Sequence, residues 1–120
     1  MNKVVDLYIP GGKELALVAK LATVGYVAKA GFTLDAAEDV KLAVEEALGA
    51  VSGERIHLQM AVDEENVLFN IEGEGASVTD ETEQEIVRCV LESMMDSVEI
   101  ESGSEFTAIR MKKRLIGGAR

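Results

Sequence analysis

The sequence predicts an α+β fold, a two-layer α/β sandwich in which three helices pack on one face of a mixed β-sheet. Two observations support this prediction. Segments with helical periodicity and segments with alternating apolar residues follow one another in the order β-α-α-β-β-α-β-β. The 120 residues are 48% hydrophobic and 28% charged, a composition typical of a globular protein. Residues 1–120 are therefore expected to form a single domain.

The chain is expected to begin with a strand and a long helix. Residues 3–10 (KVVDLYIP) form a β-like run that stops at Pro10. A helix is predicted from residue 13 to about residue 30, and Gly31 is expected to cap its C-terminus. Because this helix is apolar around much of its circumference, we expect it to be buried on two sides. The apolar positions at helical spacing are Leu15, Val18, Leu21, Ala22, Val24, Gly25 and Ala28.

The second predicted helix begins at Thr33 or at Asp35, because Asp35 followed by Glu38 three residues later is typical of an N-cap. Its two adjacent glutamates differ in position: Glu45 faces away from the apolar stripe, and Glu46 lies at the border of the stripe. The helix is expected to end at Ser52 and Gly53. Its buried stripe is predicted to contain Val40, Ala43, Val44, Ala47, Leu48 and Val51.

The rest of the chain predicts two β-hairpins around a third helix. Alternating runs at 55–62 and 66–71 flank the polar residues 63–66, and residues 97–101 and 106–115 flank a Ser-Gly-Ser turn. The segment 72–83 is expected to be a loop. The third helix is predicted over residues 83–96, with Ile86, Val87, Val90, Leu91, Met94 and Met95 facing inward.

Composition restricts the classes of function. The formal net charge of −10 argues against nucleic acid as a direct ligand and favours a partner with a basic patch. The basic run 110–114 is interpreted as the solvated end of a strand. A single cysteine, Cys89, and a single histidine, His57, exclude a cysteine metal site, and we interpret them as a spectator thiol and an exposed strand residue. With no long apolar segment, a cytoplasmic protein with no membrane partner is expected.

Read in order, these segments resemble the anti-sigma-factor serine kinases of bacteria, which belong to the histidine-kinase-like (Bergerat-fold) ATPase superfamily. In its first half, the chain is similar to the family in a strand ending in IP, a long helix, and the segments GF and DVKLAVEEA. Near its C-terminal end, the chain contains ESMMDSVEIES and TAIRMKKRL, which are similar to the family's last helix and last two strands. The resemblance covers most of residues 4–115 and implies a Bergerat-like fold.

In this family a Glu acts as general base toward the attacking hydroxyl, and an Asn four residues later holds the magnesium ion that bridges the triphosphate. The resemblance places Glu46 at the position of the base and Ala50 at the position of the Asn. A methyl group cannot coordinate magnesium, which requires oxygen ligands. No metal ligand is therefore expected here.

The resemblance also indicates a degenerate nucleotide site. The adenine-binding Asp falls on Ile71 if Gly73 is the turn glycine, or on Glu72 after a slip of one residue, and Thr107 matches a final-strand Thr near the adenine. Where the family has a Gly-rich lid, residues 85–87 read EIV, so the lid is shortened. Without magnesium, the charges on Glu46, Glu72 and Glu74 would repel a triphosphate.

The resemblance implies a regulator that binds a sigma factor, an anti-sigma-factor antagonist, or both, and that forms homodimers. We expect it to control bacterial transcription through protein–protein contacts, without cofactor and without ATP hydrolysis. The alternative is an active ATP-dependent protein-serine kinase and anti-sigma factor that uses ATP and magnesium with a displaced metal ligand, Asp39 or Glu45. A third possibility is a regulatory dimer with an unrelated small ligand in the cleft.

Overall fold

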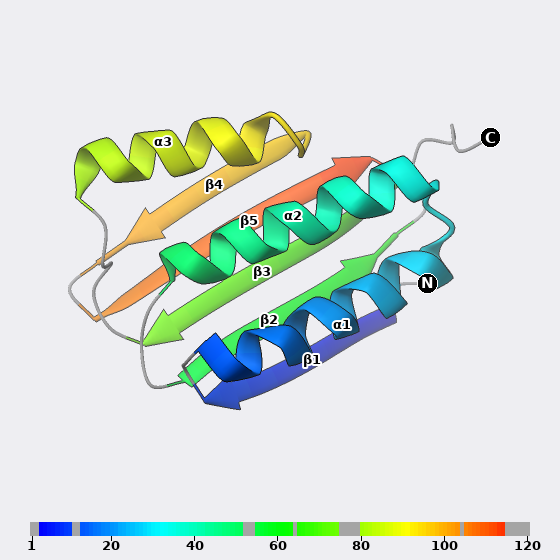
Figure 1. The fold of residues 1–120 in the computed structure, drawn as a ribbon, viewed down its shortest axis with the longest axis horizontal. Coiled ribbons are helices and arrows are strands. Elements are labelled where there is room, and N and C mark those ends of the chain that lie inside the picture. The colour runs from blue at the N-terminus through cyan, green and yellow to red at the C-terminus, as the bar shows by residue number, and fades with distance from the viewer. Residues whose placement is uncertain are drawn as a thin grey trace.

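The computed structural model describes residues 3–10, 13–51, 55–63, 65–74, 80–103 and 105–114. These residues form five strands and three helices, in the order that the sequence predicts (Figure 1). The elements are β1 (Lys3–Pro10), α1 (Lys13–Ala30), α2 (Leu34–Ala50), β2 (Arg55–Val62), β3 (Asn66–Glu74), α3 (Glu81–Glu92), β4 (Ser97–Ser102) and β5 (Phe106–Arg114).

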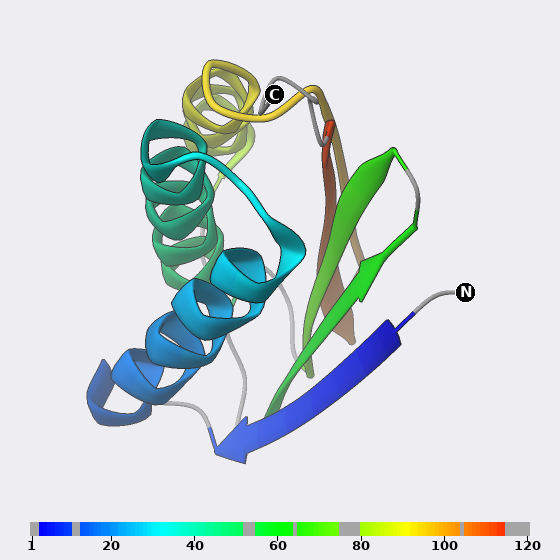
Figure 2. The same cartoon turned by 90° about the vertical axis from the view of Figure 1, so that its right-hand side faces the viewer.

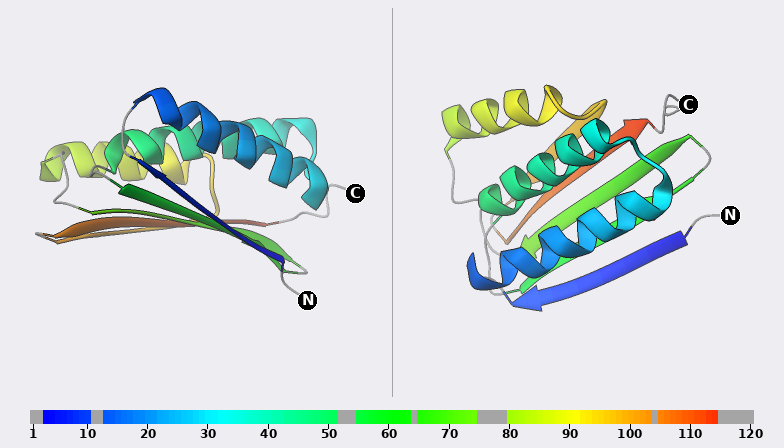
Figure 3. Two further views of the ribbon diagram at one scale, coloured as in Figure 1. Left: turned by 90° about the horizontal axis from the view of Figure 1, so that it is seen from below. Right: turned by 45° about the vertical axis from the view of Figure 1, so that its right-hand side comes forward.

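The two-layer α+β architecture is confirmed. Seen along the sheet, all three helices lie on one face and the other face is left uncovered (Figures 2 and 3). Within the helical layer, α2 contacts α1 on one side and α3 on the other, so α1 is the outer helix above β1 and β2. The interior between the layers is mainly aliphatic, and its largest fully buried side chains include Phe69, Leu58, Met60, Ile71, Leu91 and Ile109.

The sheet has the strand order β1-β2-β3-β5-β4, and all four neighbouring pairs are antiparallel, so the expected mixture of parallel and antiparallel pairs is not found. Between β1 and β2 the chain passes through two helices and therefore returns in the opposite direction. The single helix α3 makes β4 run parallel to β3, but β5 lies between these two strands. Strands that run parallel to each other are therefore never neighbours in the sheet.

Local signals set the helix ends. Gly31, which follows the last residue of α1, has a φ of +92°, and residues with a Cβ rarely adopt this backbone conformation. The hydroxyl of Thr33 accepts a hydrogen bond from the backbone N–H of Ala36 at 3.2 Å, so α2 begins after Thr33 and Asp35 lies in its first turn. The predicted end at Ser52 and Gly53 lies outside the described residues.

Helix α3 begins at Glu81 and ends at Glu92, both earlier than predicted. The Asp80 carboxylate accepts a hydrogen bond from the Glu83 N–H at 2.8 Å, and the Glu83 carboxylate accepts one from the Asp80 N–H at 3.1 Å. This capping box stabilises a start two residues before the predicted one. Strand β3 continues to Glu74, so the predicted loop starts later than residue 72.

Two predictions of burial are wrong. Helix α1 buries Ala19, Thr23 and Val27, but Leu17 and Leu21 on its other side are 56% and 62% exposed. The sheet and α2 cover α1 on one side only, so an apolar circumference does not lead to burial on two sides. On α3, Ile86 is 58% exposed because it lies beside a cleft rather than over the sheet. The predicted stripe of α2 is confirmed as buried throughout.

Candidate functional site

A cleft between α2 and α3 contains the residue that the sequence assigns to the catalytic base. The cleft has a volume of about 390 Å³. The cleft lies on the side of α2 that does not face α1, because α2 is the middle helix of the layer. The lining residues are Glu45, Glu46, Gly49 and Ala50 from α2 and Glu83, Ile86 and Val87 from α3.

The three carboxylates of the cleft differ in their contacts. Glu45 is half-exposed and forms an ion pair with Lys20 of α1, at 3.3 Å between Oε2 and Nζ. Glu83 is held by the capping box of α3. Glu46 is half-buried, and within the described part of the chain no cationic group lies within ion-pairing distance of it. Glu46 is therefore the carboxylate that is available to an outside cation.

The residues around Glu46 do not fit a magnesium ion. Ala50, one turn further along α2, is 7% exposed and presents a methyl group to the cleft. The two displaced ligands considered above are held by lysines, since Glu45 pairs with Lys20 and Asp39 lies 4.0 Å from Lys113. Across the described residues, no group of three or more His, Cys, Asp or Glu side chains is placed to hold a metal ion.

The proposed adenine-site residues lie on two different faces of the sheet. Gly73 and Thr107 are directly opposite each other on β3 and β5, and Thr107 is buried on the helix side. Ile71 points to the same side and is fully buried. Because side chains alternate along a strand, Glu72 points to the uncovered face. The structure therefore does not bring Glu72 together with Glu46 or Thr107.

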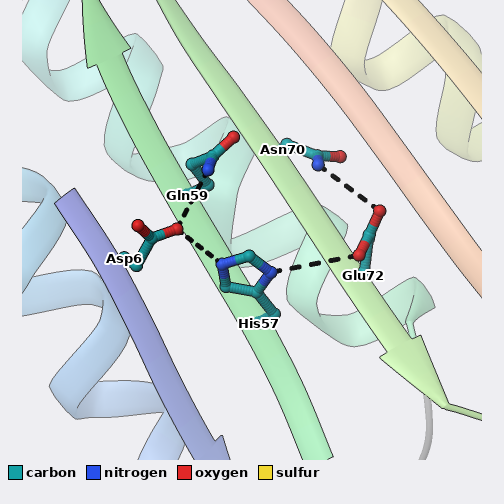
Figure 4. A network of polar contacts seen from close by, with 5 residues as sticks. All are labelled: Asp6, His57, Gln59, Asn70 and Glu72. Atoms are coloured by element: carbon teal, nitrogen blue, oxygen red, sulfur yellow. Dashed lines mark hydrogen bonds and ion pairs between the residues drawn. The ribbon is translucent and has the colours of Figure 1, made fainter. Parts of the chain in front are cut away.

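On the uncovered face, Glu72 belongs to a polar network that links β1, β2 and β3 (Figure 4). His57 Nε2 lies 2.7 Å from Asp6 Oδ1, and His57 Nδ1 lies 3.9 Å from Glu72 Oε1. Gln59 donates a hydrogen bond to Asp6 at 3.0 Å, and the amide of Asn70 lies 3.5 Å from Glu72 Oε2. The hydrogen bonds from His57 and Gln59 hold the pKa of Asp6 below its ordinary value.

The network is part of a regular polar surface. The ring of Tyr8 stacks on that of His57, with centroids 4.2 Å apart and an interplanar angle of 5°. Beside this pair, one polar residue from every strand forms a row across the uncovered face, because the register places them opposite one another. In sheet order the row is Asp6, Gln59, Asn70, Arg110 and Glu99.

The polar side chains around His57 have the chemistry of a solvated sheet surface. A histidine that works as a general base needs a nucleophile within hydrogen-bonding distance. The groups that contact His57 in the described part of the chain are two carboxylates and the ring of Tyr8. His57 is therefore better explained as a cross-strand contact than as a catalytic group, although it is only half-exposed rather than free on the surface.

The basic run 110–114 is divided between the two faces. Arg110 pairs with Glu101 at 3.1 Å on the uncovered face. Lys113 points to the helices and donates a hydrogen bond to the carbonyl of Met94 at 2.8 Å. Because alternate residues point in opposite directions, the run does not form one basic patch. Cys89 is exposed on α3.

Comparison with known proteins adds no family: no protein-family model matches the chain, and no curated protein matches it. None of the described helices is both long and apolar enough to cross a bilayer.

Sequence reasoning missed the network around His57 and the role of Ile86. Alternation predicts that His57 points away from Ile56 and Leu58, which is confirmed. The pairing of β1 with β2, which brings Asp6 to His57, is a long-range contact with no local signal. The exposure of Ile86 follows from its position beside the cleft between α2 and α3, which the periodicity of one helix cannot reveal.

Proposed function

We propose that this chain is an anti-sigma-factor-like regulator of bacterial transcription that works in the cytoplasm by binding a protein partner, without hydrolysing ATP. The resemblance described above supports the class of protein. The observation that carries the proposal is the lining of the cleft, in which Glu46 is followed one turn later by the buried methyl group of Ala50. A site with this lining suits a cation or an apolar side chain better than it suits a metal-bound triphosphate.

The charges in the cleft favour a basic partner. Glu45 and Glu46 lie on one wall, Glu83 lies on the other, and Ile86 presents an exposed apolar surface on the same wall as Glu83. Two like charges at 4 Å repel each other by about 4 kcal/mol near a protein surface, so a nucleotide without its metal is disfavoured here. A lysine or arginine next to an apolar side chain would satisfy both features of the cleft. The net charge of −10 would also steer such a partner toward the chain.

Calorimetry tests the nucleotide half of the proposal. Titration of the protein with ATP and with ADP, in the presence of magnesium, is expected to give no binding heat at millimolar nucleotide. Binding in the micromolar range would contradict the proposal and support the alternative of an active kinase. In that case Glu46→Gln would keep nucleotide binding and lose phosphoryl transfer, because only the base would be changed.

Direct binding tests the partner half. Purified sigma factors and anti-sigma-factor antagonists from the same host are each titrated against the chain, and at least one is expected to bind. Glu46→Lys should weaken that binding by about tenfold or more, because it reverses a charge in the cleft that has no cationic partner among the described residues. Glu92→Lys, an equal charge change on the exposed surface of α3 outside the cleft, should have little effect. Failure of every sigma factor and antagonist to bind would contradict the proposal.

A further inference from the structure

The cleft between α2 and α3 has an apolar floor and acidic rims. Ala50 of α2 and Val87 of α3 form the floor, since both line the cleft and are buried. Ile86 of α3 also lines the cleft but is largely exposed, so the cleft opens to solvent there. An occupant that complements the cleft therefore carries apolar and cationic groups side by side. The acidic residues of the lining are Glu45, Glu46 and Glu83.

The ends of two helices meet at the cleft, and they differ in their charges. Helices α2 and α3 run antiparallel and side by side, so the last turns of α2 lie next to the first turns of α3 (Figures 1 and 3). The first turn of α3 already holds its anions, because Glu81 and Glu83 lie in it and Asp80 caps it. The last turn of α2 contains no basic residue. Because the carbonyl end of a helix attracts cations, the α2 wall of the cleft is complementary to a cation from another molecule.

We infer that the cleft receives one amphipathic helix of a partner protein, with an apolar stripe on the floor and lysine or arginine on each flank. Charge complementarity is the reason. Among the described residues, Glu46 has no cationic group within ion-pairing distance, and it lies near the carbonyl end of α2. This rests on the proposed function, because both place the partner in the cleft, and it adds the structure of the segment that the partner presents.

The walls of the cleft favour a helix over an extended segment. Within α2 and α3 the backbone N–H and C=O groups bond to one another along each helix, so the walls offer a partner mainly side chains. An extended segment lying on the buried side chains of Ala50 and Val87 would leave part of its own backbone unpaired against an apolar surface. A helix satisfies its backbone internally and presents only side chains to the cleft.

The size of the cleft matches a short stretch of such a helix. The lining residues span about one and a half turns of each wall, 45–50 on α2 and 83–87 on α3. A partner helix would contact this length with apolar side chains three or four residues apart, which point to the same side. The volume of about 390 Å³ accommodates a few side chains. Gly49, on the α2 side, has nothing within 4 Å of where a Cβ would lie, so the partner can approach closely.

A synthetic peptide tests the chemistry of the occupant. The probe has about 15 residues, with leucines three and four positions apart on one side, lysine and arginine on both flanks, and alanine elsewhere. In a fluorescence-anisotropy titration, the chain is expected to bind it at least about tenfold more tightly than a peptide of the same composition in scrambled order. Equal binding of the two peptides would show that only the net charge of −10 attracts the probe, and would overturn the inference.

A proline at the centre of the probe tests whether the bound segment is a helix. Proline disrupts a helix interior but is compatible with an extended segment, so this peptide should bind at least about tenfold more weakly than the original probe. Circular dichroism should also show a gain of helical signal when the original probe binds. A proline peptide that binds as tightly as the original, or binding without a gain of helix, would overturn the inference.

Two helical glycines provide matched variants for the location of the contact. Gly49 lines the cleft and Gly25 lies on α1, and an added Cβ meets nothing within 4 Å at either position. Because leucine is favoured over glycine within a helix, neither substitution should disturb the fold. Gly49→Leu should weaken binding of the probe at least about tenfold by filling the cleft, and Gly25→Leu should leave it unchanged. Equal effects of the two variants, or no effect of Gly49→Leu, would overturn the inference.

Ile86 tests the apolar part of the contact. Ile86→Ala removes the largely exposed side chain at the cleft and should weaken binding of the probe by about threefold to tenfold. Leu34→Ala, a similar truncation at a more exposed site outside the cleft, should have little effect. Unchanged binding by Ile86→Ala would show that charge alone holds the probe, and would contradict an amphipathic occupant.

The same variants separate this inference from the proposed function. Binding of the probe in the cleft, with no sigma factor or antagonist bound by the chain, would contradict the proposed function alone. A sigma factor or antagonist that binds Gly49→Leu as tightly as the wild type would agree with the proposed class of regulator. It would also place the contact outside the cleft, and would overturn the inference.

Discussion

The centre and the edge of this molecule use helices of similar composition in different ways. Helix α2, at the centre, buries one aliphatic stripe and presents Glu38, Lys41 and Glu45 to solvent. Helix α1, at the edge, buries small and medium side chains and leaves Leu17 and Leu21 in water. The comparison teaches that composition sets how much of a helix can be buried, whereas the number of neighbouring elements sets how much is buried.

The largest expected effect tests whether the centre carries the stability. Leu48→Ala, at a site 8% exposed on α2, should lower the free energy of unfolding by about 2–5 kcal/mol, through lost burial and the cavity left behind. Leu42→Ala, on the exposed side of the same helix, and Leu21→Ala should each change it by about 0.5 kcal/mol or less. Urea denaturation measures all three. Equal effects at Leu48 and Leu21 would remove the distinction between centre and edge.

The turn that joins the two helices has the next largest effect. Gly31→Ala should destabilise the fold by about 1–2 kcal/mol, because Gly31 has a φ of +92°. Gly49→Ala is the matched control within α2, where an added Cβ meets nothing within 4 Å, and it should stabilise by about 0.4–1 kcal/mol. Thermal denaturation of both variants gives the two signs. A neutral Gly31→Ala would show that the connection tolerates another conformation.

The ion pair between Lys20 and Glu45 joins edge to centre and is worth less. Both side chains are partly exposed, at 28% and 50%, so solvent screens the pair. A double-mutant cycle with Lys20→Ala and Glu45→Ala should give a coupling energy of about 0.2–1 kcal/mol, and this coupling should fall in 1 M salt. The pair Glu38–Lys41, within α2, is the comparison for a contact that links no two elements.

The smallest effect concerns the β1 edge and depends on pH. Because the pKa of Asp6 is lowered in the folded state, its contribution to stability is present above the ordinary value of 3.8 and is lost as pH falls through the lowered pKa. Asp6→Asn removes this titration, so its melting temperature should fall less steeply than that of the wild type on acidification below that value. Parallel curves would show that the contact between His57 and Asp6 does not persist in solution.

The order of the elements could be predicted because each one has a local signal. The 3.6-residue period identified α1 and α2, alternation identified the strands, and the hairpins followed from short polar turns. The sequence alone allows α2 to start at Thr33 or at Asp35, because both residue types cap helices and the choice depends on which hydroxyl or carboxylate reaches a free N–H.

The relationships between elements could not be predicted. The mixed sheet was wrong because the sequence does not show that β5 lies between β3 and β4. The positions of the candidate-site residues relative to one another could not be predicted either. Glu46 was placed at the border of a buried stripe and lies there, but the separation of Glu72 from Glu46 required the face of β3 to be known to within one residue. One residue decides the face of a strand, and no local signal is that accurate.

The position of β1 in the sheet has a consequence for the order of folding. Strands β2 with β3, and β4 with β5, pair across short turns, whereas β1 meets β2 only after the chain has passed through both long helices. Closing that longer loop costs more chain entropy, so we expect β1 to dock last and to open first. Amide hydrogen exchange should then protect β3 and β5 more strongly than β1.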